Sequence, residues 1–90
     1  MALKIEREKN FIKNFNKLKL NDTEFQKFIN FVSLLSEGET LPKEAKDHQL
    51  LGEYAKYREF HIGSDMLVIY KIENETLYLA RIGTHAQLFK

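Results

Sequence analysis

The 90-residue sequence contains no cysteine, no tryptophan, one proline and four glycines. Without cysteine, the chain can form neither a disulfide framework nor a thiolate zinc site. Three glycines (Gly52, Gly63 and Gly83) stand singly, so no glycine-rich loop is available to bind a phosphate. No apolar run approaches the roughly 20 residues that span a bilayer, and the N-terminus lacks the apolar stretch of a signal peptide. We therefore expect a cytoplasmic protein with no membrane association and no cofactor.

The residues that are present predict one soluble domain over residues 1–90. Hydrophobic residues make up 43% of the sequence and charged residues 30%, which is enough for a modest core and argues against disorder. The net charge of +1 gives little support for a nucleic-acid partner. However, Lys9, Lys13 and Lys17 are spaced four apart and would line one side of a helix. They form either a solvated face or a stripe that contacts phosphates.

Hydrophobic periodicity predicts a short strand over residues 2–6 followed by two helices. Apolar residues recur at helical spacing from about 10 to 18. Asn21 or Asp22 can cap the second helix, and Glu24 is placed to complete a capping box. This helix is expected to end at Gly38. Its predicted apolar stripe consists of Phe25, Phe28, Ile29, Val32 and Leu35.

The C-terminal half changes to a period of two. Residues 38–54 are polar and contain the only proline, so we expect mostly loop. Residues 57–62, 67–72 and 77–82 are rich in aromatic and β-branched residues and predict three strands. The fold class is therefore α+β, with the N-terminal strand and a helical hairpin packed on one face of a twisted antiparallel sheet.

Strand register decides whether two polar side chains share a face. With residues 74–75 as the tip of the second hairpin, Val68 faces Arg81. A four-residue turn at 63–66 would place His61 opposite Val68 as well, and a three-residue turn would send His61 to the other face. In the four-residue case the face beneath the helices would carry Phe60, Ile62, Leu67, Ile69, Ala80 and Ile82.

All three histidines, His48, His61 and His85, lie in the C-terminal half together with Arg81. Cleavage of RNA without a metal requires a base for the 2′-OH proton, an acid for the 5′-oxygen and a cation for the phosphorane. Histidine suits the first two tasks because its pKa of about 6.5 allows both forms near neutrality. Arginine suits the third because its planar guanidinium matches phosphate oxygens. These residues therefore indicate a candidate nuclease site.

Other interpretations of these residues remain open. Each histidine could be a hydrogen-bonded surface residue, and Arg81 could form a salt bridge with Asp65 or Glu59. A three-histidine metal site is poorly supported, because separations of 13 and 24 residues (61 − 48 and 85 − 61) match no helix or hairpin ligand pair. We therefore predict no metal.

Lys46 to Phe89 contains several separated motifs that resemble the YafQ branch of the RelE-like bacterial toxins. These motifs are "DH.L.G", "YRE.HI..D", "L.IYKI" and "R.GTH..LF", in that order. The resemblance implies a RelE-like fold and a ribosome-dependent, metal-independent endoribonuclease that cuts mRNA. It also implies a cognate antitoxin as partner. The functional positions that it implies are His48, His61, Asp65, Arg81, His85 and Phe89.

Roles for these residues follow from the resemblance and from their chemistry. Arg81 would stabilise the charge of the phosphorane and His85 would be the general acid. Asp65 or His48 would be the base, with His61 orienting the phosphate. Met66 stands where relatives often carry tryptophan, which replaces an aromatic platform with an apolar contact. The residues expected to contact RNA are Phe89, Met66, Arg58, Lys9, Lys13 and Lys17.

The main alternative is a non-catalytic module on the RelE/ParE scaffold, either a degenerate toxin that still binds antitoxin or a relative with another target such as gyrase. A purely binding relative has no need to keep acid and base groups together, so the histidine set favours the enzyme. An antitoxin would bind with a helix or an added strand over an apolar sheet face.

Overall fold

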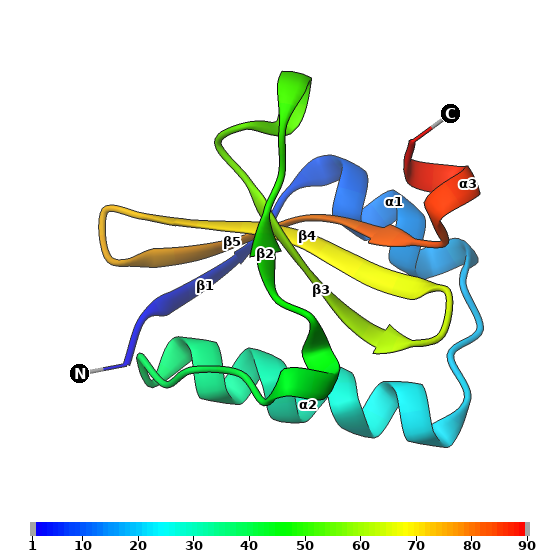
Figure 1. Cartoon of the computed structure of the whole chain (residues 1–90), viewed down its shortest axis with the longest axis horizontal. Coiled ribbons are helices and arrows are strands. Elements are labelled where there is room, and N and C mark those ends of the chain that lie inside the picture. Colours follow the sequence, from blue (N-terminus) through cyan, green and yellow to red (C-terminus); the bar gives the residue numbers. More distant parts are fainter. Residues whose placement is uncertain (1, 90) are drawn as a thin grey trace.

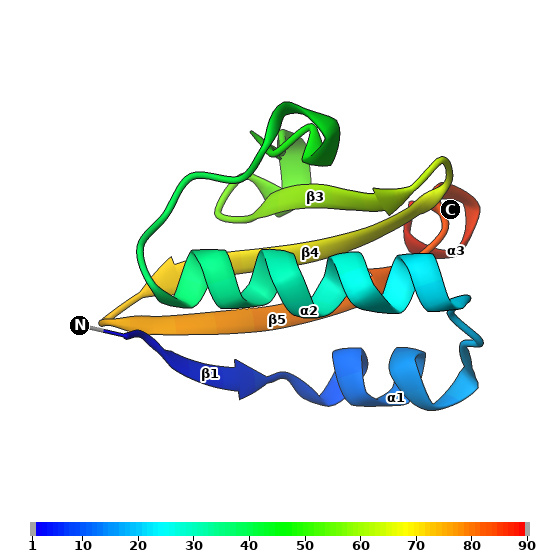
Figure 2. The same cartoon turned by 90° about the horizontal axis from the view of Figure 1, so that it is seen from below.

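The computed structural model describes residues 2–89 as a five-stranded sheet with helices on both faces (Figures 1 and 2). The strand order is β1-β5-β4-β3-β2. The elements in chain order are β1 (Lys4–Arg7), α1 (Lys9–Lys17), α2 (Asp22–Ser36), β2 (His48–Gln49), β3 (Arg58–Gly63), β4 (Met66–Glu73), β5 (Thr76–Gly83) and α3 (His85–Leu88), with 3-10 turns at Lys43–Ala45 and Gly52–Tyr54. None of the described helices is long and apolar enough to cross a bilayer.

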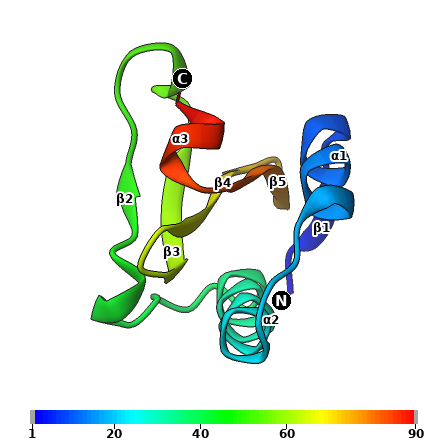
Figure 3. The same ribbon diagram turned by 90° about the vertical axis from the view of Figure 1, so that its right-hand side faces the viewer.

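The sheet is mixed, which corrects the expectation of an antiparallel sheet. Strand β1 pairs with β5 in parallel, and all other neighbours are antiparallel. Helices α1 and α2 cover one face, whereas α3 lies over the opposite side of β4 and β5 (Figure 3). The α+β class and the placement of both long helices on one face agree with the prediction from the sequence.

Local side-chain chemistry fixes the start of α2. The Asn21 side chain accepts a hydrogen bond from the Glu24 backbone N–H at 2.7 Å, and the Glu24 carboxylate accepts one from the Asn21 N–H at 3.0 Å. This confirms the predicted capping box. The predicted apolar stripe is only partly correct, because Phe25 and Ile29 are 48% and 53% exposed. Phe31, which the predicted stripe omits, is buried instead.

A β-bulge in β5 alters the predicted register. Pairing from the tip holds as far as Tyr70 with Leu79, but the next residue, Ile69, pairs with Arg81. Ala80 is therefore the extra residue of the bulge. Because of this extra residue, Leu79 and Ile82 both point into the core under the long helices. The alternating hydrophobic pattern of the sequence does not reveal this bulge.

A second irregularity lies at the end of β3, between His61 and Gly63. His61 pairs with Leu67 rather than with Val68, and Val68 pairs with Ile82. Val68 belongs to the core under the helices, whereas His61 is on the other face. The prediction that His61, Val68 and Arg81 share one face of the sheet is therefore wrong for Val68.

Two apolar clusters sandwich the sheet. The larger one joins α1 and α2 to the sheet through residues such as Phe11, Phe28 and Phe60. The smaller one lies on the opposite face and consists of Leu50, Leu67, Ile69, Ala80 and Leu88. Three of these residues, Leu67, Ile69 and Ala80, were expected beneath the long helices, so this part of the prediction is wrong. Residues 48–57 and α3 cover this second face instead.

The turn between β4 and β5 generates a prediction about stability. Asn74 and Glu75 both have positive φ, 52° and 58°, as a two-residue hairpin turn with strong strand twist requires. Glycine adopts this conformation without the cost that glutamate incurs. Glu75→Gly should therefore raise the free energy of unfolding by about 0.5–1 kcal/mol, measured by urea denaturation.

The matched control for this experiment is Glu73→Gly, because Glu73 lies at the end of strand β4 and shows no positive φ. It should lower the urea midpoint, since glycine weakens strands. A midpoint for Glu75→Gly at or below that of the unmodified protein would contradict the assignment of strain to Glu75.

Candidate active site

The centre of the candidate site is the buried carboxylate of Glu59, which is only 3% exposed. Its Oε2 atom lies 3.1 Å from His61 Nε2, 3.3 Å from His48 Nε2 and 4.0 Å from His85 Nε2. The three histidines are far apart in the sequence but converge on this one oxygen. Glu59 itself is absent from the residues predicted for the site. The alternation in "YREFH" is the signal that places Glu59 and His61 on one face.

Each histidine reaches Glu59 from a different element. His61 follows Glu59 by two residues in β3, so both side chains project from the same face. His48 is directly opposite Glu59 in the β2–β3 pair. His85 is the first residue of α3, immediately after β5. Strand β2 and helix α3 are both missing from the prediction, yet they deliver two of the three imidazoles.

His48 is held from both sides of its ring. Its Nδ1 atom lies 2.7 Å from the Lys46 carbonyl oxygen, and its Nε2 atom faces Glu59. Lys46 adopts a left-handed conformation, with φ 49° and ψ 41°, after the 3-10 turn that ends at Ala45. This bend comes directly before the segment that carries His48 into the sheet. The imidazole is therefore fixed in orientation although about half of it is exposed.

His85 is positioned by Asp65, which lies in the β3–β4 turn. The Asp65 carboxylate accepts a hydrogen bond from the His85 backbone N–H at 3.2 Å, and His85 Nδ1 lies 3.3 Å from the same oxygen. These hydrogen bonds, the backbone one first, lower the pKa of Asp65 below its ordinary value. A capping box between Thr84 and Gln87 closes the same helical turn. Asp65 is consequently an ionised partner for the His85 ring.

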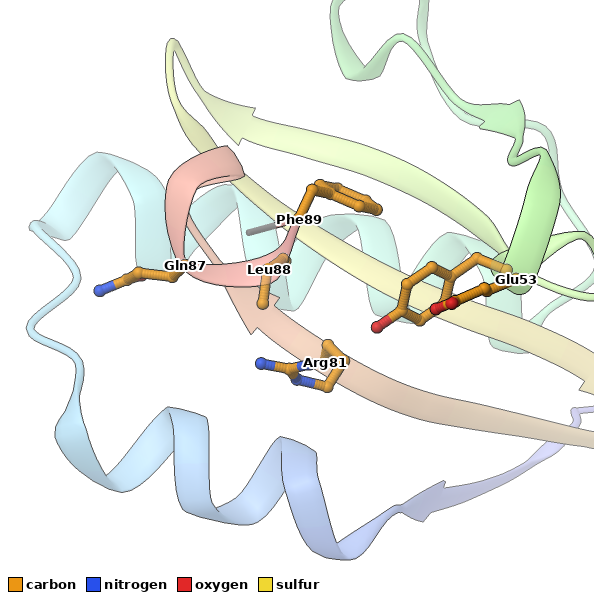
Figure 4. Close-up of a pocket in the computed structure, with 6 residues that line it drawn as sticks. Glu53, Arg81, Gln87, Leu88 and Phe89 are labelled. Carbon is orange, nitrogen blue, oxygen red and sulfur yellow. The ribbon is translucent and has the colours of Figure 1, made fainter.

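Arg81 borders the site without an acidic partner. Its Nε atom donates a hydrogen bond to Asn14 Oδ1 of α1 at 2.8 Å. Within residues 2–89 it forms no ion pair, so the alternative of a salt bridge with Asp65 or Glu59 does not hold in this structure. Its side chain lines a pocket of about 560 Å³ (Figure 4). The guanidinium is thus available to an anion in that pocket.

The pocket beside Arg81 has an aromatic wall. Phe89 is 39% exposed, and its ring centroid lies 5.9 Å from that of His85 and 5.6 Å from that of Tyr54. Glu53, Gln87 and Leu88 complete the lining (Figure 4). An aromatic face next to a cation is suited to an unpaired nucleotide. Tyr54 also contributes to this wall and is absent from the residues predicted for the site.

The remaining predicted RNA contacts are not all near this centre. Arg58 is bound to Asp47, with Nε 3.1 Å from its Oδ1, and Tyr70 donates to the same oxygen at 2.8 Å. Because Arg58 precedes Glu59 in the strand, its side chain lies on the other face. Met66 packs against the core under the helices.

The lysine stripe of α1 is exposed along its length. Of its three members, Lys9, Lys13 and Lys17, only Lys17 lines a hollow together with Arg81. The stripe therefore meets the candidate site at the C-terminal end of α1.

The side chains of Glu59, His61 and His85 could also surround a metal ion. One ligand atom from each lies within 4.8 Å of the others. Imidazole and carboxylate together suit transition metals such as zinc or copper. In this structure His61 Nε2 is hydrogen-bonded to Glu59 at 3.1 Å, and His85 Nε2 lies 4.0 Å from the same oxygen.

Comparisons with known proteins identify the family. Residues 3–90 match the family described as the bacterial toxin of type II toxin–antitoxin system, YafQ. The mRNA interferase toxin YafQ of Escherichia coli K12 is 40% identical over 63 residues, which are 68% of each chain. The structure of the E. coli DinJ–YafQ toxin–antitoxin complex matches at 30% identity and a TM-score of 0.80, covering all of both chains. A copper-bound mutant toxin from Helicobacter pylori matches at 33% identity and a TM-score of 0.83, covering 97% of this chain and 99% of that one.

By fold and by these matches the chain is a RelE/ParE-like toxin, and it belongs to the YafQ family of type II toxin–antitoxin systems. The family suggested by the motifs between Lys46 and Phe89 is therefore confirmed, and the match extends over the N-terminal half as well.

The contact between Asp65 and His85 generates a prediction about protonation. Because the donors on His85 stabilise the carboxylate, the pKa of Asp65 is lowered in the folded protein. His85→Ala removes the ring but keeps the backbone N–H, so the pKa of Asp65 should rise part of the way towards its ordinary value. Carbon-detected NMR titration of the Asp65 carboxyl measures this change.

A lowered pKa also fixes the sign of the stability effect. The contribution of this contact is present at neutral pH and is lost as the pH falls through the lowered pKa of Asp65. His48→Ala is the control, because His48 does not touch Asp65 and should leave its pKa unchanged. The assignment fails if His85→Ala leaves the Asp65 titration where it was.

Proposed function

We propose that this protein is a ribosome-dependent, metal-independent endoribonuclease that cleaves mRNA, and that it acts as the toxin of its toxin–antitoxin pair. The observation that carries this proposal is the convergence of three imidazoles on Glu59 beside an arginine that has no acidic partner among residues 2–89. The relative from E. coli named an mRNA interferase supports the same activity.

The reaction needs three groups, and the site supplies each type. A base takes the proton of the 2′-OH, and the resulting oxygen attacks the adjacent phosphorus. An acid gives a proton to the departing 5′-oxygen, so the products are a 2′,3′-cyclic phosphate and a free 5′-OH. His85 is the proposed acid, because Asp65 engages Nδ1 and orients the ring while Nε2–H remains to be donated.

Arg81 and Phe89 are proposed to hold the scissile nucleotide. The guanidinium of Arg81 stabilises the charge that develops on the phosphorane, and it is already oriented by Asn14. Phe89 stacks on a base next to the cleaved bond. The proton acceptor comes from the remaining members of the set, His48, His61 and Asp65. The exposed Lys17 extends the cationic surface towards the neighbouring phosphates.

We also propose a cognate antitoxin as the protein partner, because the related YafQ of E. coli is found in a complex with DinJ. The sheet face with Tyr70, Leu77 and Leu79, which a partner was expected to cover, is already covered within the chain by α1 and α2. The expected docking of an antitoxin over that face therefore has to occur elsewhere on the surface. The exposed Phe25 and Ile29 on α2 are apolar residues that remain free for such a contact.

The proposed roles predict the effect of two substitutions. His85→Ala and Arg81→Ala should each lower the single-turnover rate of mRNA cleavage on ribosomes at least about a hundredfold. The loss follows from removal of the acid in one case and of charge stabilisation in the other. Arg7→Ala is the matched control, since Arg7 is exposed on β1 and forms no ion pair in the described chain. Near-normal rates for either site variant would remove that residue from the mechanism.

Expression in growing cells tests the function as a whole. Induction should arrest growth and produce new mRNA 5′ ends within reading frames, because cleavage on the ribosome follows translation. Both effects should be lost with Arg81→Ala. Absence of arrest with the unmodified chain would favour the non-catalytic binding module, on the RelE/ParE scaffold, over the enzyme.

Metal independence is tested separately. Side chains fill all three chemical roles, so a chelator selective for transition metals, which leaves the magnesium of the ribosome in place, should not change the cleavage rate. Added Cu²⁺ or Zn²⁺ should inhibit, because coordination would occupy the imidazoles of His61 and His85. Loss of activity on chelation, restored by one of these ions, would show that the reaction needs a metal.

A further inference from the structure

The negative charge of Glu59 is compensated in an unusual way. A carboxylate that is 3% exposed needs donors or cations close by. In the part of the chain that the structure describes, Glu59 has no lysine or arginine partner, and every side chain within ion-pair distance is a histidine. The orientation and the hydrogen placement of the His61 ring therefore depend on the Glu59 carboxylate.

We propose that Glu59 is a positioning residue that fixes the ring orientation and the hydrogen placement of His61, and thereby makes His61 the proton acceptor. This inference rests on the proposed nuclease function and deepens it. An ionised carboxylate only accepts hydrogen bonds. The Nε2 atom of His61, which is hydrogen-bonded to Oε2 at 3.1 Å, must therefore carry a hydrogen.

The same argument removes His48 from the candidates for the base. Its second nitrogen, Nδ1, lies 2.7 Å from the Lys46 carbonyl oxygen, which also only accepts. Nδ1 therefore donates to that carbonyl, and the other nitrogen, Nε2, lies 3.3 Å from the buried Glu59 carboxylate. The negative charge of Glu59 would repel the 2′-oxygen that a base at this position has to approach.

Asp65 is an unsuitable base for a different reason. Its Oδ1 atom already receives the backbone N–H and the Nδ1 of His85. These bonds lower its pKa, which makes the carboxylate a poorer proton acceptor at neutral pH. Asp65 is therefore committed to His85, the proposed acid.

His61 alone keeps an unengaged lone pair. Its Nε2–H points to Glu59, so Nδ1 is the free nitrogen, and no described residue hydrogen-bonds to it. No side-chain nitrogen or oxygen that is fully buried lacks a partner within residues 2–89, so this Nδ1 is open to solvent. The His61 ring also lies 5.6 Å from that of His85, centroid to centroid. Base and acid thus stand side by side, with Glu59 orienting the base as the aspartate does in a catalytic triad.

Substitution of Glu59 tests this arrangement. Glu59→Gln keeps the shape but removes the charge, so the single-turnover rate at saturating ribosomes should fall about 10- to 100-fold. The half-saturating ribosome concentration should stay the same, because Glu59 does not touch substrate. Glu59→Asp restores the charge and should recover part of the rate. Glu39→Gln, on an exposed glutamate whose side chain forms no hydrogen bond or ion pair in the described chain, is the matched control and should behave like the unmodified protein.

NMR of the histidine rings provides a test that does not depend on the folding of a variant. Long-range ¹H–¹⁵N spectra of the unmodified protein near neutral pH should show hydrogen on Nε2 of His61 but not on Nδ1. In Glu59→Gln this pattern should be lost at His61. A bare Nε2 on His61 of the unmodified protein would overturn the inference.

The outcomes separate this inference from the proposed function. If the unmodified protein does not cleave mRNA, the function fails while the ring spectra still report on Glu59. If it cleaves mRNA and Glu59→Gln does so at an equal rate, the positioning role fails and the nuclease function stands.

Discussion

Burial of the Glu59 carboxylate is the constraint around which the second sheet face is organised. A charge that is withdrawn from water is tolerated only when donors surround it. Here His61 of β3 donates a hydrogen bond to the carboxylate, and the Nε2 atoms of His48 in β2 and His85 in α3 lie 3.3 and 4.0 Å away. These contacts join three segments of the chain and bring the residues of the candidate site together.

The bulge at Ala80 solves a packing problem that a regular strand cannot. Leu79 and Ile82 both belong to the core under the long helices, although they are three residues apart. The extra residue between them lets the strand regain that face, and it leaves the intervening Arg81 at the rim of the pocket. Asn14 of α1 then fixes the guanidinium from the helix side. The bulge that interrupts the alternation of the sequence therefore also places the guanidinium of Arg81 at the pocket.

The sequence is informative where structure is local. The capping box of Asn21 and the hairpin tip at Asn74 depend on neighbouring residues, and both are correctly predicted. The bulge at Ala80 is missed because it results from packing against helices that are distant in the sequence. The strand at His48 and the helix at His85 are missed because each is too short to produce a period. Glu59 is missed because the local pattern does not show that residues distant in the sequence bury its side chain.

Helix α3 is one turn long and has no stability of its own, since an isolated turn of that size does not form in water. Its order is derived from the Thr84 cap and from Leu88, which is buried in the smaller core. The geometry of His85 therefore depends on Asp65 and also on a buried aliphatic side chain three residues away. Loosening the apolar packing of Leu88 would therefore also displace the proposed acid.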